Sequence, residues 1–172
     1  MGAANLYEED IYAWAEQQAA ALRRLAGLGG LPNELDLEHV TEEIADLGIS
    51  ELNGAKSYIR NILSHLILLR LDGAAPAVGH WTREVITWQA ELQQRLTRAM
   101  HRRIDLDDVW RRAVREADRH LEAENRTDSL AWLRLAVQPA IGSACPFSLD
   151  YLLDDSFRVL DAVPLVTALD LS

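Results

Sequence analysis

The feature that most constrains the fold is a long run, about residues 36 to 71, in which apolar side chains recur at gaps of three and four. This spacing places the side chains on one face of an α-helix. At 1.5 Å per residue, one helix over the whole run is about 54 Å long. The apolar stripe consists of Leu37, Val40, Ile44, Leu47, Ala55, Tyr58, Ile59, Ile62, Leu63, Leu66 and Leu69.

The two halves of this helix differ in composition. Beyond Tyr58 the apolar stripe widens until most sides of the helix are apolar, which predicts that this half is surrounded by other helices. Gly48 and Gly54 each cost about 1 kcal/mol relative to alanine in a helix interior. The sequence therefore leaves open whether the helix bends or breaks between Gly48 and Gly54.

The rest of the chain also shows helical periodicity, without the alternation typical of strands. We expect helices over about 8–26, 81–103, 106–124 and 129–137 and a short helix ending near 153, with N-caps at Asp36, Asp105, Asp128 and Ser148. The predicted fold class is all-α: a helical bundle with one long central helix (about 36–71) and shorter C-terminal helices. We expect a single domain over 1–172, whose apolar tail, 158–172, packs on the bundle or on a neighbouring molecule.

Charge and composition disfavour several partners. The formal net charge of −10 repels nucleic-acid phosphates and anionic membrane surfaces, so we expect neither as a partner. The N-terminus lacks the basic and apolar regions of a signal peptide, and no apolar stretch reaches the roughly 20 residues of a membrane span. Cys145 is the one cysteine, which is typical of a reducing compartment. These features predict an acidic, cytoplasmic protein.

Acidic residues gather at the start of the long helix. Glu42 and Asp46 are four residues apart on one helical face and could bind a divalent metal together with Glu43. The Glu-x-x-His pair found in metal-binding bundles is absent, however. The alternative is a solvated helix start, where acids interact favourably with the helix dipole. The full cluster is Glu34, Asp36, Glu38, Glu42, Glu43 and Asp46.

His65 lies in the most apolar part of the long helix. A buried imidazole can act as a metal ligand or a base, but it is more often a core residue with a satisfied hydrogen bond. The sequence contains no Gly-x-Ser-x-Gly, P-loop or Gly-x-Gly-x-x-Gly motif, so it predicts no cofactor and favours a protein that is not an enzyme. No cation lies near Cys145 in the sequence, which favours an inert thiol.

Arginines are concentrated between residues 95 and 119. They could form a phosphate-binding face. Alternatively, if the third helix packs antiparallel to the long helix, its arginine-bearing end would lie beside the acidic start and form ion pairs there. The arginines are Arg95, Arg98, Arg102, Arg103, Arg111, Arg112, Arg115 and Arg119. Aromatic residues such as Tyr7, Trp14 and Trp81 are more often core or interface anchors than ligand cages.

Several segments occur together in an order that resembles a known family. Leu6 to Trp14 opens the chain, Asp36 to Gly48 opens the long helix, and Ser64-His65-Leu66 follows further along it. Trp81 starts the third helix, and Cys145 to Asp154 comes near the end. In these segments the chain resembles the bacterial family called domain of unknown function 29, over about residues 6–157. The resemblance implies a helical fold and brings no activity.

Two classes of function are therefore considered. The first is a non-catalytic helical interaction module that binds a protein, with a second copy of the chain as one candidate and with Tyr7, Trp14, Trp81, Arg98 and Arg102 as contact residues. The alternative is a small-ligand or metal-binding helical bundle, including an unrecognised hydrolase. Its candidate ligands are His65, Glu42, Glu43 and Asp46. In the alternative class, His65 should converge with at least two polar side chains of another helix in a pocket. In the first class, His65 should be isolated by hydrocarbon.

Overall fold

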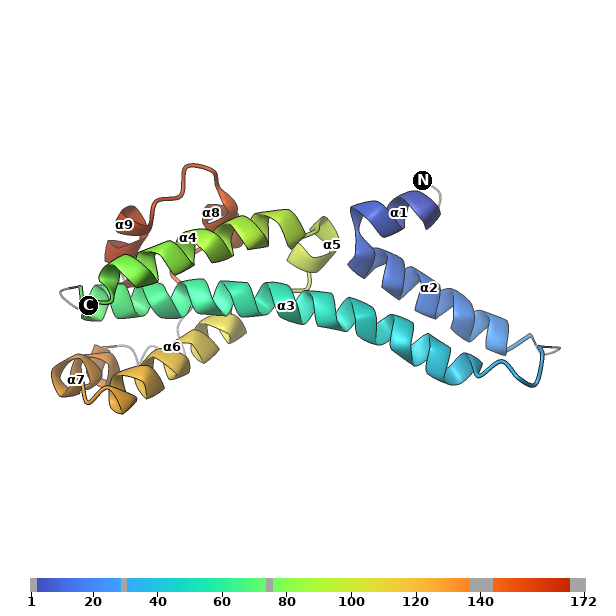
Figure 1. Cartoon of the computed structure of the whole chain (residues 1–172), viewed down its shortest axis with the longest axis horizontal. Coiled ribbons are helices and arrows are strands. Elements are labelled where there is room, and N and C mark those ends of the chain that lie inside the picture. The colour runs from blue at the N-terminus through green and yellow to red at the C-terminus, as the bar shows by residue number, and fades with distance from the viewer. Residues whose placement is uncertain (1–2, 29–30, 74–75, 137–143, 168–172) are drawn as a thin grey trace. The chain divides into compact units, whose positions relative to one another are not determined.

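The computed structural model describes residues 3–28, 31–73, 76–136 and 144–167, and this part of the chain contains helices and no strand (Figure 1). The all-α prediction is confirmed. The helices are α1 (Ala3–Glu9), α2 (Ile11–Ala26), α3 (Leu37–Leu71), α4 (Val78–Arg95), α5 (Arg98–His101), α6 (Leu106–Ala123), α7 (Thr127–Ala136), α8 (Leu149–Leu153), α9 (Val159–Ala162) and the 3₁₀ helix η2 (Val163–Thr167).

The predicted long helix is α3, which is unbroken from Leu37 to Leu71. Its N-terminus is capped as expected, since the backbone N–H of His39 donates to Asp36 Oδ1 at 3.2 Å. The helix continues through Gly48, and α2 approaches it closely at this position. A Cβ at position 48 would lie 3.0 Å from the Cβ of Ala15, so a larger residue would force the two helices apart.

The chain divides into two compact units, and α3 contributes to both of them. Unit 1 consists of Met1–Ala55 and Leu96–Arg103, and unit 2 consists of Lys56–Arg95 and Ile104–Ser172. The expectation of a single domain stays a prediction, because two compact units that share a helix can belong to one domain or to two.

Unit 1 is built on a hairpin of α2 and the first part of α3, with small side chains between the two helices. The short helix α5 packs on α2, where Arg103 forms an ion pair with Glu16 at 3.1 Å and Tyr12 donates to the same carboxylate at 2.9 Å. The buried residues of the hairpin are Tyr12, Ala15 and Ala19 on α2 and Leu37, Thr41, Gly48 and Ala55 on α3.

Unit 2 has a core of large aliphatic and aromatic side chains. The second part of α3 runs between α4 and α6 (Figure 1), as its nearly all-round apolar surface predicts. Fully buried side chains of this core include Ile59, Ile62, Leu63, Leu66 and Ile67 on α3, Leu92 on α4, and Trp110 and Leu121 on α6.

Two of the expected helices are interrupted by a capping residue. The first expected helix is divided at Asp10, which ends α1 and caps α2 by accepting from the N–H of Ala13 at 2.9 Å. The third, expected over 81–103, begins earlier, at Val78, and ends at Arg95. Thr97 then caps α5 by accepting from the N–H of Met100 at 3.3 Å. In both places a local side-chain hydrogen bond competes with the continuing helix.

The C-terminal part of unit 2 lies against α4. Gln89 Nε2 on α4 donates to the backbone oxygen of Leu152 at 3.2 Å, and Gln93 Nε2 donates to that of Leu153 at 2.8 Å. Within the described part of the expected tail, Val159, Ala162 and Val166 are buried, so the tail packs on the same chain. Residues 168–172 lie outside the described residues. None of the described helices has the length and apolar composition of a bilayer span.

Candidate functional site

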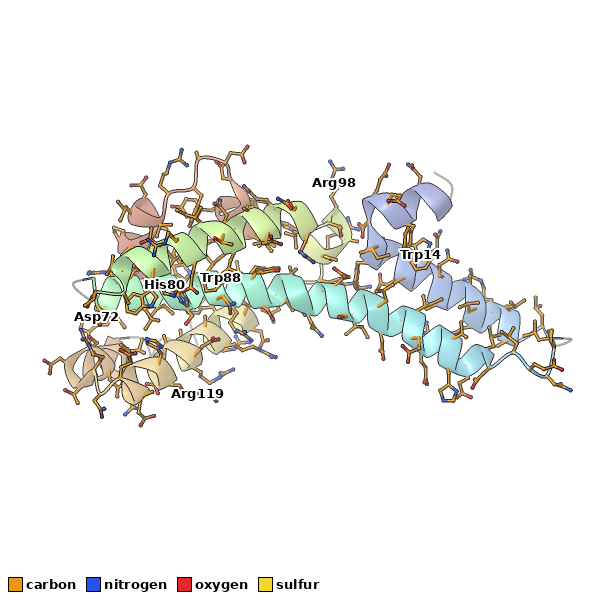
Figure 2. The ribbon with its side chains drawn as sticks, in the orientation of Figure 1. Trp14, Asp72, His80, Trp88, Arg98 and Arg119 are labelled. Atoms are coloured by element: carbon orange, nitrogen blue, oxygen red, sulfur yellow. The ribbon has the colours of Figure 1, made fainter. Side chains whose placement is uncertain are left out.

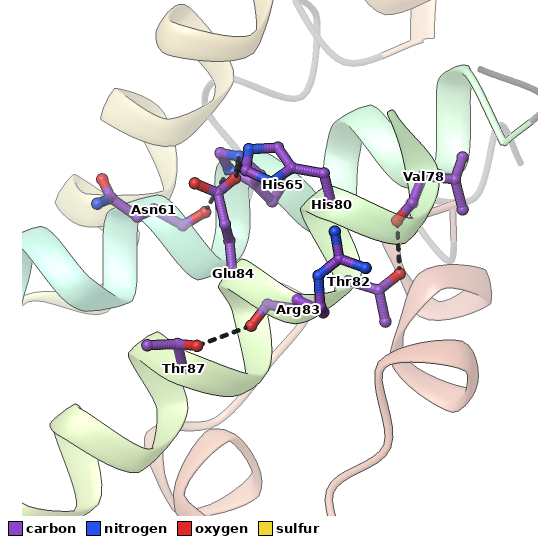
Figure 3. Close-up of polar contacts among 8 residues, drawn as sticks. All are labelled: Asn61, His65, Val78, His80, Thr82, Arg83, Glu84 and Thr87. Carbon is purple, nitrogen blue, oxygen red and sulfur yellow. Dashed lines mark hydrogen bonds and ion pairs between the residues drawn. The ribbon is translucent and has the colours of Figure 1, made fainter. Parts of the chain in front are cut away.

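A polar cluster within unit 2 surrounds His65 and connects α3 to α4 (Figure 3). His65 Nδ1 lies 3.1 Å from the backbone oxygen of Asn61, one turn earlier on α3. His65 Nε2 lies 3.1 Å from Oε2 of Glu84 on α4. The same carboxylate oxygen is 3.3 Å from Nε2 of His80, which is four residues before Glu84 on α4. One carboxylate oxygen of Glu84 therefore contacts two imidazole rings.

Both ring nitrogens of His65 face oxygen atoms that accept hydrogen bonds, and a neutral imidazole has only one N–H to donate. The neutral ring can therefore satisfy one of these two contacts at a time. The exposed His80 faces the same carboxylate oxygen of Glu84.

Indole rings surround His65. The ring centroid of Trp88 is 4.7 Å from that of His65, and the ring centroid of Trp81 is 6.4 Å away, both in edge-to-face geometry. The side chain of His65 is 19% exposed. This burial lowers the pKa of the imidazole, while Glu84 and the Asn61 carbonyl raise the pKa and offset part of the effect.

A third histidine, His120 on α6, also contacts the ring of Trp81. The two ring centroids are 5.9 Å apart, and Nε2 of His120 is buried without a hydrogen-bond partner. Trp81 itself is only 6% exposed. Its indole contacts both His65 and His120, and its role as a contact residue for a partner stays a prediction.

A cavity of about 600 Å³ opens on a different side of α4. Its α4 residues are Thr82, Ile86, Gln89 and Gln93, and the segment 155–161 forms the remaining wall. Since successive helical residues differ by about 100°, Ile86 and Glu84 point away from each other. His65 does converge with polar side chains of another helix, but the cluster does not line this cavity. The arrangement connects two helices and presents no reacting group to the cavity.

The predicted metal candidates are not brought together. Glu42, Glu43 and Asp46 are exposed on the first part of α3, and His65 lies about five helical turns or more further along the same helix. Among the residues that the structure describes, no group of three or more His, Cys, Asp or Glu side chains has the geometry to hold a metal ion.

Cys145 is a poor nucleophile in this environment. Burial raises the pKa of its thiol to about 12, which keeps the thiol protonated at neutral pH. Its backbone N–H donates to Oδ1 of Asp107 at 2.7 Å, so the residue joins the segment before α8 to the start of α6. The interpretation of Cys145 as an inert thiol agrees with this geometry.

The arginines were expected to pair with the acidic start of the long helix, but the ion pairs of the structure join them to other residues. Arg103 pairs with Glu16 on α2, Arg112 pairs with Asp108 on its own helix, and Arg60 pairs with Glu116. The physical reason is helix length: α4 ends at Arg95, which lies over the ring of Tyr58 on the second part of α3.

Sequence reasoning identified His65 but missed its partners, Glu84, His80 and His120. A signal for Glu84 was present. Two antiparallel helices joined by a short turn place residues at equal distances from the turn side by side, and His65 and Glu84 each lie about ten residues from its centre. His80 and Glu84 are four residues apart, which adds the second imidazole. The sequence carried no comparable signal for His120.

Together, the fold and this cluster define an all-α protein in which a histidine–carboxylate pair joins two packed helices. The chain belongs to the family described as domain of unknown function DUF29, whose model matches residues 6–158. A similar solved structure is the crystal structure of an alpha-helical protein of unknown function from Rhodospirillum rubrum. It is 37% identical to this chain, has a TM-score of 0.75, and the match covers 92% of this chain and 95% of that chain. No curated protein matches the sequence. The family and its solved relative assign no molecular function, and neither indicates catalysis.

Proposed function

We propose that the protein is a non-catalytic helical interaction module that pairs with a second copy of itself through unit 1. The observation that carries the proposal is the number of large apolar side chains that remain exposed on this unit. A two-helix layer can bury only one face of each helix, so it needs a second layer to cover the rest. The exposed apolar residues of unit 1 are Tyr7, Leu25, Leu28, Leu35, Val40, Leu47 and Ile49.

The spacing of these residues fits helix pairing. Val40 and Leu47 are seven residues apart on α3, the repeat with which a helix presents a continuous seam to a partner helix. Tyr7 packs edge-to-face on Trp14 with ring centroids 4.9 Å apart, which provides an aromatic anchor. Trp14 is labelled on α2 in Figure 2. Two hairpins that cover each other's exposed faces would form a four-helix bundle.

Charge complementarity favours a second copy as the occupant. Glu38, Glu42 and Asp46 are exposed on successive turns of α3, and Arg98 and Arg102 are exposed four residues apart at α5. Within the described part of the chain, no ion pair engages these five side chains. In a twofold dimer every contact occurs twice, so the acids of each copy would meet the arginines of the other.

The test is sedimentation equilibrium of the full chain. We expect a dimer that dissociates about tenfold or more readily when Val40→Glu and Leu47→Glu place charges on the seam. Leu160→Glu is the matched control, because Leu160 is a highly exposed leucine of unit 2. Wild-type protein that remains monomeric up to about 100 μM would contradict the proposal, since a specific dimer binds more tightly than this.

A charge-reversal experiment tests the orientation. Arg98→Glu with Arg102→Glu should weaken the dimer, and mixing this variant with a Glu38→Arg, Glu42→Arg, Asp46→Arg variant should restore association as a heterodimer. Circular dichroism of each variant checks that the helices still form. No recovery in the mixture would argue against this pairing of charges.

We also infer a cytoplasmic location, which the presence of a single cysteine supports. Cell fractionation would test it, and recovery of the protein from an oxidising compartment would contradict it.

A further inference from the structure

A hollow of about 470 Å³ lies on the surface of unit 2 where α3 meets α6. Its lining consists of four arginines and one glutamate: Arg60 from α3, and Arg112, Arg115, Glu116 and Arg119 from α6. Arg119 is labelled in Figure 2. All five side chains are charged, and their formal charges sum to about +3 in a chain whose net charge is −10.

The ion pairs of the hollow leave much of this positive charge uncompensated. Nε of Arg60 lies 2.8 Å from Oε2 of Glu116, although its N–H does not point at that oxygen and makes no hydrogen bond. Arg112 pairs at 2.8 Å with Asp108, which lies outside the hollow. Arg115 and Arg119 are exposed and take part in no ion pair among the described residues. Four guanidinium groups around one hollow repel one another unless an anion lies between them.

We propose that this hollow binds a small ligand that carries two or more phosphate groups. This inference goes beyond the proposed dimer and is independent of it, because it uses residues of unit 2 only. Guanidinium groups bind phosphate oxygens through paired N–H donors, which makes arginine the preferred side chain for this chemistry.

The size and lining of the hollow favour a small ligand over a macromolecule. Its volume is in the range of small-molecule sites. It lacks the apolar side chains that form the centre of a protein interface. A long nucleic acid would extend beyond the hollow and meet the field of a chain whose net charge is −10, which repels it. A small anion avoids that repulsion.

The spacing of the arginines favours more than one phosphate group. Arg112 and Arg119 lie about 10 Å apart along α6, at 1.5 Å per residue. A single phosphate group is too small to contact all the guanidinium groups spread over this length. A chain of phosphates reaches Arg115 and Arg119 together while Arg60 approaches from α3.

The test is isothermal titration calorimetry of the full chain with inorganic triphosphate as the probe. We expect saturable binding that weakens as salt is raised, because screening reduces the attraction. Orthophosphate should bind at least about tenfold more weakly than triphosphate, because it engages fewer guanidinium groups. Absence of saturable triphosphate binding would overturn the proposal, and so would citrate binding as tightly as triphosphate.

Variants separate a defined site from general attraction. Arg115→Gln with Arg119→Gln should weaken triphosphate binding about tenfold or more. Arg83→Gln is the matched control, because Arg83 is an exposed arginine of the same unit outside the hollow and should leave the affinity unchanged. The proposal would be overturned if Arg83→Gln lowered the triphosphate affinity as much, per arginine removed, as the substitutions in the hollow.

Glu116→Gln gives a change in the opposite direction. Removal of the one carboxylate in the hollow should tighten triphosphate binding about threefold, an effect of the size expected for an exposed charge. A misfolded variant could not produce this gain. Weaker binding by Glu116→Gln would contradict the assigned role of the hollow.

Discussion

The two parts of α3 pack in different ways although they belong to one continuous helix. In unit 1 the helix buries a narrow stripe that includes Gly48 and Ala55, and the neighbouring helix α2 contributes Ala15 and Ala19. In unit 2 the helix buries isoleucine and leucine on most of its sides. Stability in unit 1 therefore depends on close approach of two backbones, and stability in unit 2 depends on the volume of apolar side chains that is removed from water.

This difference indicates where each proposed function lies. A thin helical pair leaves apolar surface exposed, which suits association with another copy. Unit 2 has a large buried core and presents charged side chains on a helix that packs on this core, as around Arg115 and Arg119. Three pairs of substitutions, at leucines, glycines and histidines of the two units, test whether this comparison is correct.

The largest effect is expected from the core of unit 2. Leu66→Ala should lower the free energy of unfolding by about 3 kcal/mol, because it leaves a cavity where the side chain is fully buried. Leu47→Ala removes the same atoms in unit 1, where the side chain is 38% exposed, and should cost less than about 1 kcal/mol in dilute protein. Urea denaturation at low protein concentration measures both. Equal losses would show that the first part of α3 is packed as deeply as the second.

The two glycines of α3 should respond oppositely to substitution by alanine. Gly54→Ala should stabilise unit 1 by about 1 kcal/mol, because alanine favours the helix and nothing lies within 4 Å of the new methyl group. Gly48→Ala should lose this gain or reverse it, because the methyl group would lie 3.0 Å from the Cβ of Ala15. Thermal unfolding of both variants measures the difference.

A compensating change identifies the cause of the Gly48 effect. Ala15→Gly removes the methyl group that the new side chain meets. The double variant with Gly48→Ala should therefore be more stable than the sum of the two single effects predicts. Strict additivity would show that the two residues do not limit the approach of α2 to α3.

The smallest effect is a pH dependence of opposite sign in the two units. Burial lowers the pKa of His65 in unit 2, so its contribution to stability is present above the ordinary histidine pKa of about 6.5 and is lost as the pH falls. A side-chain hydrogen bond with Asp36 raises the pKa of the exposed His39 in unit 1. The contribution of His39 is present below 6.5 and is lost as the pH rises through the folded-state value.

The measurement is urea denaturation of His65→Gln and His39→Gln between about pH 5 and pH 8, a range that contains the ordinary histidine pKa. Relative to wild type, His65→Gln should be comparatively more stable at the acid end, and His39→Gln comparatively more stable at the alkaline end. If the stability of both variants relative to wild type changed in the same direction with pH, the environments assigned to His65 and His39 would be contradicted. The charged and titratable groups around His65 are Glu84 and His120, and His80 contacts the same Glu84 carboxylate.

Features governed by local chemistry could be predicted from the sequence. The bounds of α3 and the caps at Asp36, Asp105 and Ser148 follow from side chains within a few residues of the helix ends. The sequence did not predict the interruptions at Asp10 and Thr97. The apolar periodicity continues through both positions, so it gives no sign of the new helix that each residue caps.

The candidate sites depend on contacts between helices, which the sequence specifies less directly. His65 was identified from its apolar surroundings, but Glu84 required the register between α3 and α4. The arginine hollow required the approach of Arg60 from α3 to a stripe on α6. The pattern on α6 was visible in the sequence, whereas the contribution of α3 was not, because Arg60 is isolated within an apolar run.

The contact between Gly48 and Ala15 has a consequence for how sequences of this family can diverge. Because the two positions share one small space, a larger residue at either of them is compatible with the hairpin only if the other stays at its minimum size. Positions 15 and 48 should therefore change together over evolutionary time. The exposed Gly54, one and a half turns further along α3, should vary freely.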